Sequence, residues 1–142
     1  MLTDFLEVKT FEGQGFQPLV SYGSWRVAAL RYMDEIAPDR IDSMERHIAT
    51  DEVFILVAGK GMLILGGNDT LVTHAQMIEM KIGDVYNVKK NTWHTIVLSQ
   101  NAKVILVEND DTGKDNSHYH LINRDLQVSL QQSAHEFLDS FK

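Results

Sequence analysis

The chain has 142 residues, of which 44% are hydrophobic and 23% are charged, and its net charge at pH 7 is −7. This length suits one domain with its own hydrophobic core, and the negative charge argues against nucleic acid as a partner, because phosphate carries the same sign. The chain has no cysteine, which excludes disulfides and thiolate metal sites. No apolar run approaches the length of a membrane helix and the first residues lack the pattern of a signal peptide, so we expect a cytoplasmic protein without membrane contact.

The middle of the chain predicts short β-strands separated by turns. Residues 25–33 are apolar and tolerant of β-structure, and residues 52–58 form a continuous apolar run. Gly59 and Gly61, followed by the apolar residues 62–65, indicate a hairpin. Further strands are expected over residues 71–80, 85–88, 95–98 and 103–108, and this regular spacing is typical of a sandwich or barrel.

The C-terminal part of the chain changes from the period of a strand to the period of a helix. Apolar residues recur there at helical spacing with polar residues between them: Leu126, Leu130, Ala134, Phe137, Leu138 and Phe141. This pattern predicts an amphipathic helix over about residues 126–140. We expect its apolar face to pack on the barrel or on a partner chain.

Residues 45–59 contain the first of two motifs with metal-binding residue types. His47 is followed after four residues by Glu52, and Glu52 is followed after six residues by Gly59. This segment resembles the first motif of the cupin superfamily, in which two histidines one residue apart precede the glutamate. Glu45 stands where that motif has its first histidine.

Residues 83–98 resemble the second cupin motif. Gly83 and His94 occupy the positions of its first glycine and its histidine. Lys89 replaces its proline, Asn91 replaces its second glycine, and Leu98 replaces its closing asparagine. Asn91 is the mildest departure, because asparagine tolerates the left-handed backbone conformation that glycine adopts in a turn.

The resemblance covers about residues 25–110 and implies an all-β fold, a double-stranded antiparallel β-helix or jelly-roll barrel with a C-terminal helix. We expect one domain over residues 1–142, with an N-terminal arm over residues 1–24, a barrel core over about residues 25–110, and a C-terminal segment with the helix over about residues 118–141. An open barrel has sheet edges that must be covered. We therefore expect a homodimer, with residues 4–16 and the C-terminal helix as candidates for its interface.

The candidate site combines residues of both motifs. Residues 45 and 47 share one face of a strand, and the resemblance places Glu52 and His94 in the same lumen. The implied metal ligands are Glu45, His47, Glu52 and His94, a donor set that suits Fe(II), Mn(II), Ni(II) or Zn(II). Two alternatives stay open: Glu45 pairs with Arg46 or another cation and leaves a weak or empty site, or Glu52 lies at the strand mouth, bonded to solvent or an arginine.

Other residues bear on the pocket less directly. Strand alternation predicts that Trp93 points away from the lumen, as a core or interface aromatic. The remaining histidines fall outside both motifs and are expected at the surface or at an interface: His74, His118, His120 and His135. Five further residues are candidates for the pocket walls: Arg31, Tyr32, Met33, Tyr86 and Glu108.

The resemblance implies a small-molecule pocket and a divalent-metal-dependent enzyme that acts on a small polar metabolite, of an anionic or sugar-like kind. Small cupins include isomerases, dioxygenases and decarboxylases, and the fold does not choose among them. In such a site the metal polarises a carbonyl or binds a diolate, while Glu52 or Glu45 transfers a proton. The alternative function is that of a non-catalytic cupin that binds a ligand without metal.

Overall fold

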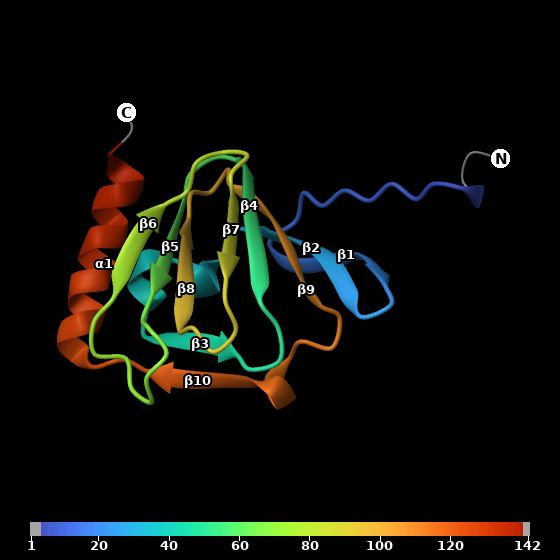
Figure 1. Ribbon diagram of the computed structural model, residues 1–142. Coiled ribbons are helices and arrows are strands. Elements are labelled where there is room, and N and C mark those ends of the chain that lie inside the picture. The colour runs from blue at the N-terminus through green and yellow to red at the C-terminus, as the bar shows by residue number, and fades with distance from the viewer. Residues whose placement is uncertain (1–3, 141–142) are drawn as a thin grey trace.

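The computed structural model describes residues 4–140 and contains two antiparallel sheets of five strands each (Figure 1). In spatial order, the first sheet consists of β1 (Gly15–Tyr22), β2 (Trp25–Arg31), β9 (Lys103–Asn109), β4 (Glu52–Ala58) and β7 (Val85–Val88). The second consists of β10 (Ser117–Leu121), β3 (Ser43–His47), β8 (His94–Leu98), β5 (Gly61–Leu65) and β6 (Gln76–Glu79). The short 3-10 helices η2 (Asp34–Ile36) and η3 (Pro38–Arg40) connect β2 to β3, and η4 (Lys114–Asn116) precedes β10. The expected all-β fold is confirmed.

Alternate residues of the strands fill the space between the sheets, as the period of a strand requires. On β4, Phe54 and Leu56 are buried, and Phe54 pairs with the buried Leu106 of β9. These residues belong to one apolar cluster that also includes side chains of β2, β5 and β8. Towards one end of the barrel, the same inward-facing rows continue with polar residues, namely Glu52 on β4 and Glu108 on β9.

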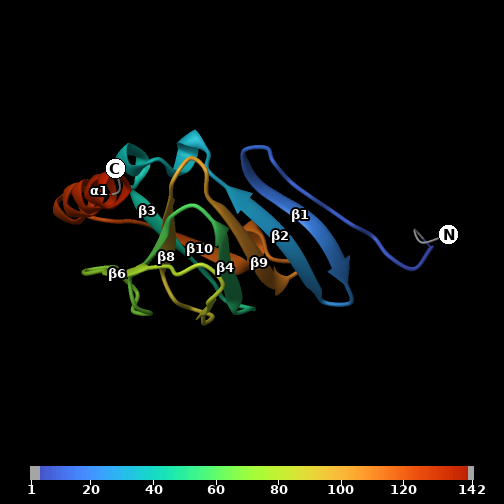
Figure 2. The same ribbon diagram turned by 90° about the horizontal axis from the view of Figure 1, so that it is seen from above.

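A second apolar core joins the second sheet to α1 (Arg124–Asp139), which lies against that sheet (Figures 1 and 2). Its buried members include Met44, Ile64, Trp93, Val97, Leu130, Ala134 and Phe137. Asn123 caps the helix by accepting a hydrogen bond from the Leu126 amide at 2.9 Å. The helix begins two residues before its expected start, and Phe141 lies outside the described residues. Among residues 4–140, no helix is long and apolar enough to cross a membrane.

Residues 15–22 extend the barrel beyond its expected N-terminal limit. They form β1, which pairs with β2 along its whole length, whereas the sequence predicted an arm over residues 1–24. Pro18 and the mostly exposed side chains of this segment conceal the strand in the sequence. An edge strand can contain proline and needs no strictly alternating buried face, because one of its sides has no partner strand.

Two turns in the motif segments depend on left-handed backbone conformations. Asn91 has a φ of 67° and is the one non-glycine residue with positive φ in the described part of the chain. This conformation agrees with its place at a glycine position of the motif. Gly59 has a φ of 72°, and a Cβ atom there would lie 2.6 Å from the Cα atom of Ala102. Glycine is therefore required at the end of β4 for two reasons, conformation and space.

We expect Gly59→Ala to lower the free energy of unfolding by about 2–4 kcal/mol, because the new methyl group would collide with backbone that cannot move aside cheaply. Gly23→Ala is the matched control, since Gly23 has a φ of 58° and nothing lies within 4 Å of its added Cβ. Gly23→Ala should lower the free energy of unfolding only by the conformational cost of a positive φ, about 1–2 kcal/mol. Urea denaturation measures both losses, and equal losses would contradict the steric argument.

Candidate metal centre

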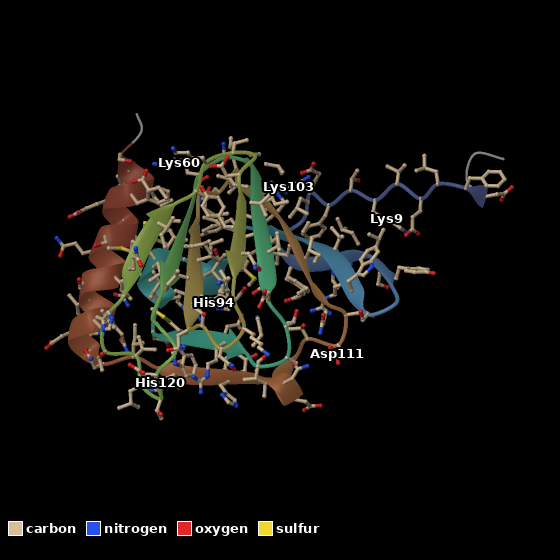
Figure 3. The ribbon with its side chains drawn as sticks, in the orientation of Figure 1. Lys9, Lys60, His94, Lys103, Asp111 and His120 are labelled. Carbon is tan, nitrogen blue, oxygen red and sulfur yellow. The ribbon has the colours of Figure 1, made fainter. Side chains whose placement is uncertain are left out.

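The two motifs meet at one end of the barrel. Glu45 and His47 lie on β3, Glu52 is the first residue of β4, and His94 is the first residue of β8. Glu45 is the direct cross-strand partner of His94, and Figure 3 labels His94 inside the barrel. The structure thus brings together all four residues that the sequence predicted as ligands.

The carboxylate of Glu52 lies between the two imidazoles. Its Oε1 atom is 3.1 Å from Nε2 of His47 and 3.1 Å from Nε2 of His94. Glu45 approaches from the side, with its Oε1 atom 3.8 Å from Nε2 of His47. One ligand atom each from Glu45, His47 and His94 fall within 4.8 Å of one another. His47, Glu52 and His94 are buried, whereas the side chain of Glu45 is 38% exposed.

The second ring nitrogen of each histidine has a fixed partner. Nδ1 of His94 lies 2.9 Å from the carbonyl oxygen of Thr92, and a carbonyl can only accept, so Nδ1 carries a proton. A neutral His94 therefore directs the lone pair of Nε2 towards Glu52, and two acceptors face each other unless a proton or a metal ion lies between them. Nδ1 of His47 lies 2.8 Å from Oγ of Ser117, which can donate or accept. Metal-binding histidines are typically oriented by contacts of this kind.

Burial and mutual contact act in opposite directions on the pKa values of the cluster. Burial raises the pKa of the Glu52 carboxyl, but hydrogen bonds with His47 and His94 and the charges of both rings bring it down to about 2. Burial lowers the pKa of the two imidazoles, but the hydrogen bond and the charge of Glu52 leave both pKa values above 6.5. The cluster therefore stabilises positive charge beside Glu52, whether a proton or a cation carries it.

Glu108 on β9 is a buried carboxyl beside this cluster that the sequence marked only as a candidate wall residue. One atom each from His47, Glu52 and Glu108 lie within 4.8 Å of one another. Burial and then the negative charge of Glu52 raise the pKa of Glu108 to about 7, although Arg26 opposes this shift. The Oε1 atom of Glu108 is buried and has no hydrogen-bond partner among the described residues.

Arg26 of β2 holds Glu108 and the loop after β9. Its guanidinium donates to Oε2 of Glu108 at 2.7 and 3.2 Å, and to the carbonyl oxygens of Asp110 at 3.1 Å and Thr112 at 3.2 Å. Sequence reasoning missed Arg26 and also Ser117, which pairs with His47 across β10 and β3. The only sequence signal for these two residues is that each lies in an inward-facing row of its strand. The segment that forms β10 shows no apolar alternation that would predict a strand.

The other candidates lie in several environments. Arg46 does not pair with Glu45: its guanidinium lies 4.4 Å from the Trp93 ring centroid and donates to His118. Arg31 forms an ion pair with Glu12. Glu45, His47, Glu52 and His94 line a cavity of about 450 Å³, whose walls include Met33 and Glu108 among the expected residues.

No family model matches the chain, and no curated protein matches it. Solved structures do resemble it. Pac13 from Streptomyces, described as a unique nucleoside dehydratase, superposes with a TM-score of 0.55 at 13% identity, over 81% of this chain and 87% of its own, and a variant of it was solved with uridine. KdgF from Halomonas sp. has a TM-score of 0.50 at 15% identity, over 68% of this chain and 78% of its own. A cupin-2 domain containing protein from Shewanella frigidimarina has a TM-score of 0.49 at 19% identity, over 70% of this chain and 84% of its own.

The chain has the cupin fold. The resemblance inferred from the two motifs is thereby confirmed at the level of the fold. Identities this low identify a fold and leave the activity to the chemistry of the site. Among the four candidate ligands, the side chain that departs from the two motifs is Glu45, which occupies the position of a histidine.

We expect the metal-free protein to be most stable near about pH 4.5–5 and to lose stability as pH rises above that range. The raised pKa values of His47 and His94 give stability that is present below 6.5 and is lost as pH rises through their folded-state values. Glu108, whose pKa is raised to about 7, contributes stability that is present below 4.5 and is lost as pH rises towards 7. The contribution of Glu52 is present above 4.5 and is lost only as pH falls towards about 2.

Melting temperatures in the presence of a chelator, from about pH 5 to about pH 8, measure this dependence. Glu52→Gln should flatten it, because the two imidazoles then lose the carboxylate that raises their pKa values. A melting temperature that rises steadily over the same range in the wild type would show that the imidazoles are not held charged by Glu52.

Proposed function

We propose that this cupin is a divalent-metal-dependent enzyme that acts on a small polar or sugar-like molecule, and that Glu45, His47, Glu52 and His94 hold the ion. One observation carries the proposal: the Thr92 carbonyl fixes the tautomer of neutral His94, so that Nε2 of the neutral ring presents a lone pair next to the Glu52 carboxylate. A cation between these atoms would satisfy both of them at once.

The chemistry of the donor set fits such an ion. Two imidazoles and one buried carboxylate suit Fe(II), Mn(II), Ni(II) or Zn(II). Glu45 adds a second carboxylate, and this favours the harder ions of that group. The side chains are mounted on strands of both sheets, so their positions are set by the barrel rather than by a loop.

A bound divalent ion would supply a Lewis acid that polarises an oxygen atom of the substrate. The remaining roles fall to side chains of the chain itself. Thr92 and Ser117 keep the two imidazoles in position through their second nitrogens. Glu108, whose pKa is raised to about 7, can hold a proton near neutral pH within reach of the same cavity. Arg26 fixes the other oxygen of Glu108.

The second candidate function is that of a metal-free ligand-binding cupin. It is favoured by the Ser117 hydroxyl, which can donate to Nδ1 of His47 and so leave Nε2 of that ring as a proton donor to Glu52. In this state, protons replace the ion, and the two histidines act as hydrogen-bonding groups for an organic ligand. Uridine is a suitable probe for this function, because a variant of Pac13 was solved with it.

We expect Mn(II), Ni(II) or Zn(II) to raise the melting temperature of the wild type as metal concentration increases, since the ion binds the folded state. The gain should shrink as pH falls through the histidine range near about 6.5, because ligation requires deprotonated rings. His94→Ala should abolish the gain. Glu45→Gln should weaken it if this carboxylate is a ligand and leave it unchanged if it is a rim residue.

His74→Ala is the matched control, because His74 is exposed and lies outside the cluster, and it should respond to metal like the wild type. Absence of any metal-dependent gain in the wild type at millimolar metal would contradict the metal centre. Stabilisation by uridine under those conditions would then support the metal-free function.

We also propose that the cupin forms a homodimer. Phe5 and Val8 lie on the segment before β1, which runs away from the barrel (Figure 2), and they are 88% and 75% exposed. Apolar side chains on an extended segment gain free energy when a second chain covers them. Light scattering should give about twice the chain mass of 16.1 kDa. Replacement of both residues by serine should shift the mass towards the monomer, and a monomeric wild type at micromolar concentration would refute the proposal.

A further inference from the structure

One part of the cavity wall is apolar and incompletely covered. Phe16 on β1 and Leu30 on β2 line the cavity together with Met33 and Ile36 from the connection to β3. Phe16 is 39% exposed, and Met33 and Ile36 are half-buried. An apolar group placed against these side chains would remove their surface from water, which is worth about 25 cal/mol per Å². The metal cluster lies on other strands, so the cavity has one polar end and one apolar side.

The charged groups that line the cavity have no excess of positive charge that could attract an anion. Five carboxyl groups line it: Glu35, Asp42, Glu45, Glu52 and Glu108. Two guanidinium groups oppose them, and that of Arg26 is already paired with Glu108 at 2.7 Å. A divalent ion and both arginines together carry four positive charges, which the carboxylates offset in full even when Glu108 holds a proton. The exposed rim, with Glu35 and Asp42 against Arg40, is itself net negative, so an anionic ligand would meet repulsion on entry.

We propose that the cavity binds an uncharged molecule that has two adjacent oxygen atoms at one end and an apolar body. The inference rests on the proposed metal centre and narrows its ligand from small polar molecules in general to those that also carry an apolar part. An ion with four protein ligands and a preference for six has two positions left, which two adjacent oxygens can fill. The apolar body then lies against Phe16, Met33 and Ile36, and no charged group of the ligand has to be buried beside the carboxylates.

Three small probes separate the elements of this proposal in titration calorimetry with the Mn(II)-loaded protein, because Mn(II) favours six ligands. Catechol has two adjacent oxygens and an apolar ring, phenol lacks the second oxygen, and 3,4-dihydroxybenzoate adds a negative charge to the catechol ring. Catechol should bind about tenfold or more tightly than either of the others. Phenol that binds as tightly as catechol would overturn the two-oxygen requirement, and tighter binding of the benzoate would overturn the charge argument.

Two variants test the walls directly. Phe16→Ala should weaken catechol binding several-fold, whereas Tyr22→Ala on the same strand, at a side chain that is 77% exposed, should not.

Glu35→Lys should strengthen binding of 3,4-dihydroxybenzoate and leave catechol binding nearly unchanged. Glu79→Lys on β6 makes the same charge change away from the cavity and should affect neither probe. Equal effects of the paired variants would show that the cavity wall does not select the ligand.

The outcomes separate this inference from the proposed function. A protein that metal stabilises but that does not distinguish catechol from phenol keeps its metal centre and refutes the ligand class. A protein that metal does not stabilise refutes the proposed function, and the ligand class fails with it. In the first case, Phe16→Ala should retain the wild-type response to metal alone, which confirms that this variant is folded and that its cluster is intact.

Discussion

The buried carboxylate of Glu52 sets the requirements for the rest of the site. An ionised carboxyl in a protein interior is costly unless positive charge or several donors surround it. Two imidazole nitrogens at 3.1 Å meet that need, and each imidazole is in turn held by Ser117 or by the Thr92 carbonyl. The contacts extend outwards from one oxygen atom, so a change in any member alters the charge balance of all the others.

The barrel keeps this polar cluster close to the apolar core without mixing the two. Inward-facing rows run from a polar residue to an apolar one two positions away: Glu52 to Phe54, His94 to Ile96, and Glu108 to Leu106. Because the period of a strand is two, a one-residue change of register would exchange the site for outward-facing residues. The same register that packs the core therefore places the ligands, and fold and site are specified together.

The sequence predicted what depends on local spacing and missed what depends on distant pairing. The gaps around His47, Glu52 and His94 identify strands and turns, so their convergence followed from the motif. Asn91 adopts the conformation that its position requires. The contact between Arg26 and Glu108 spans 82 residues, and that between His47 and Ser117 spans 70. Nothing in the local pattern relates such residues, and only the sheet order shows that they meet.

Glu45 has a different role from Glu52, although both carry the same charge. Glu52 is enclosed by its partners, whereas Glu45 is 38% exposed and pairs across the sheet with Tyr119, which is 58% exposed. Burial and then the negative charge of Glu45 raise the pKa of the Tyr119 hydroxyl, so this tyrosine stays protonated and can donate to the carboxylate. An exposed carboxylate loses much of its attraction for a cation to solvent. Glu52 therefore determines whether a proton or a cation is held in the barrel, and Glu45 changes how strongly the site attracts that positive charge.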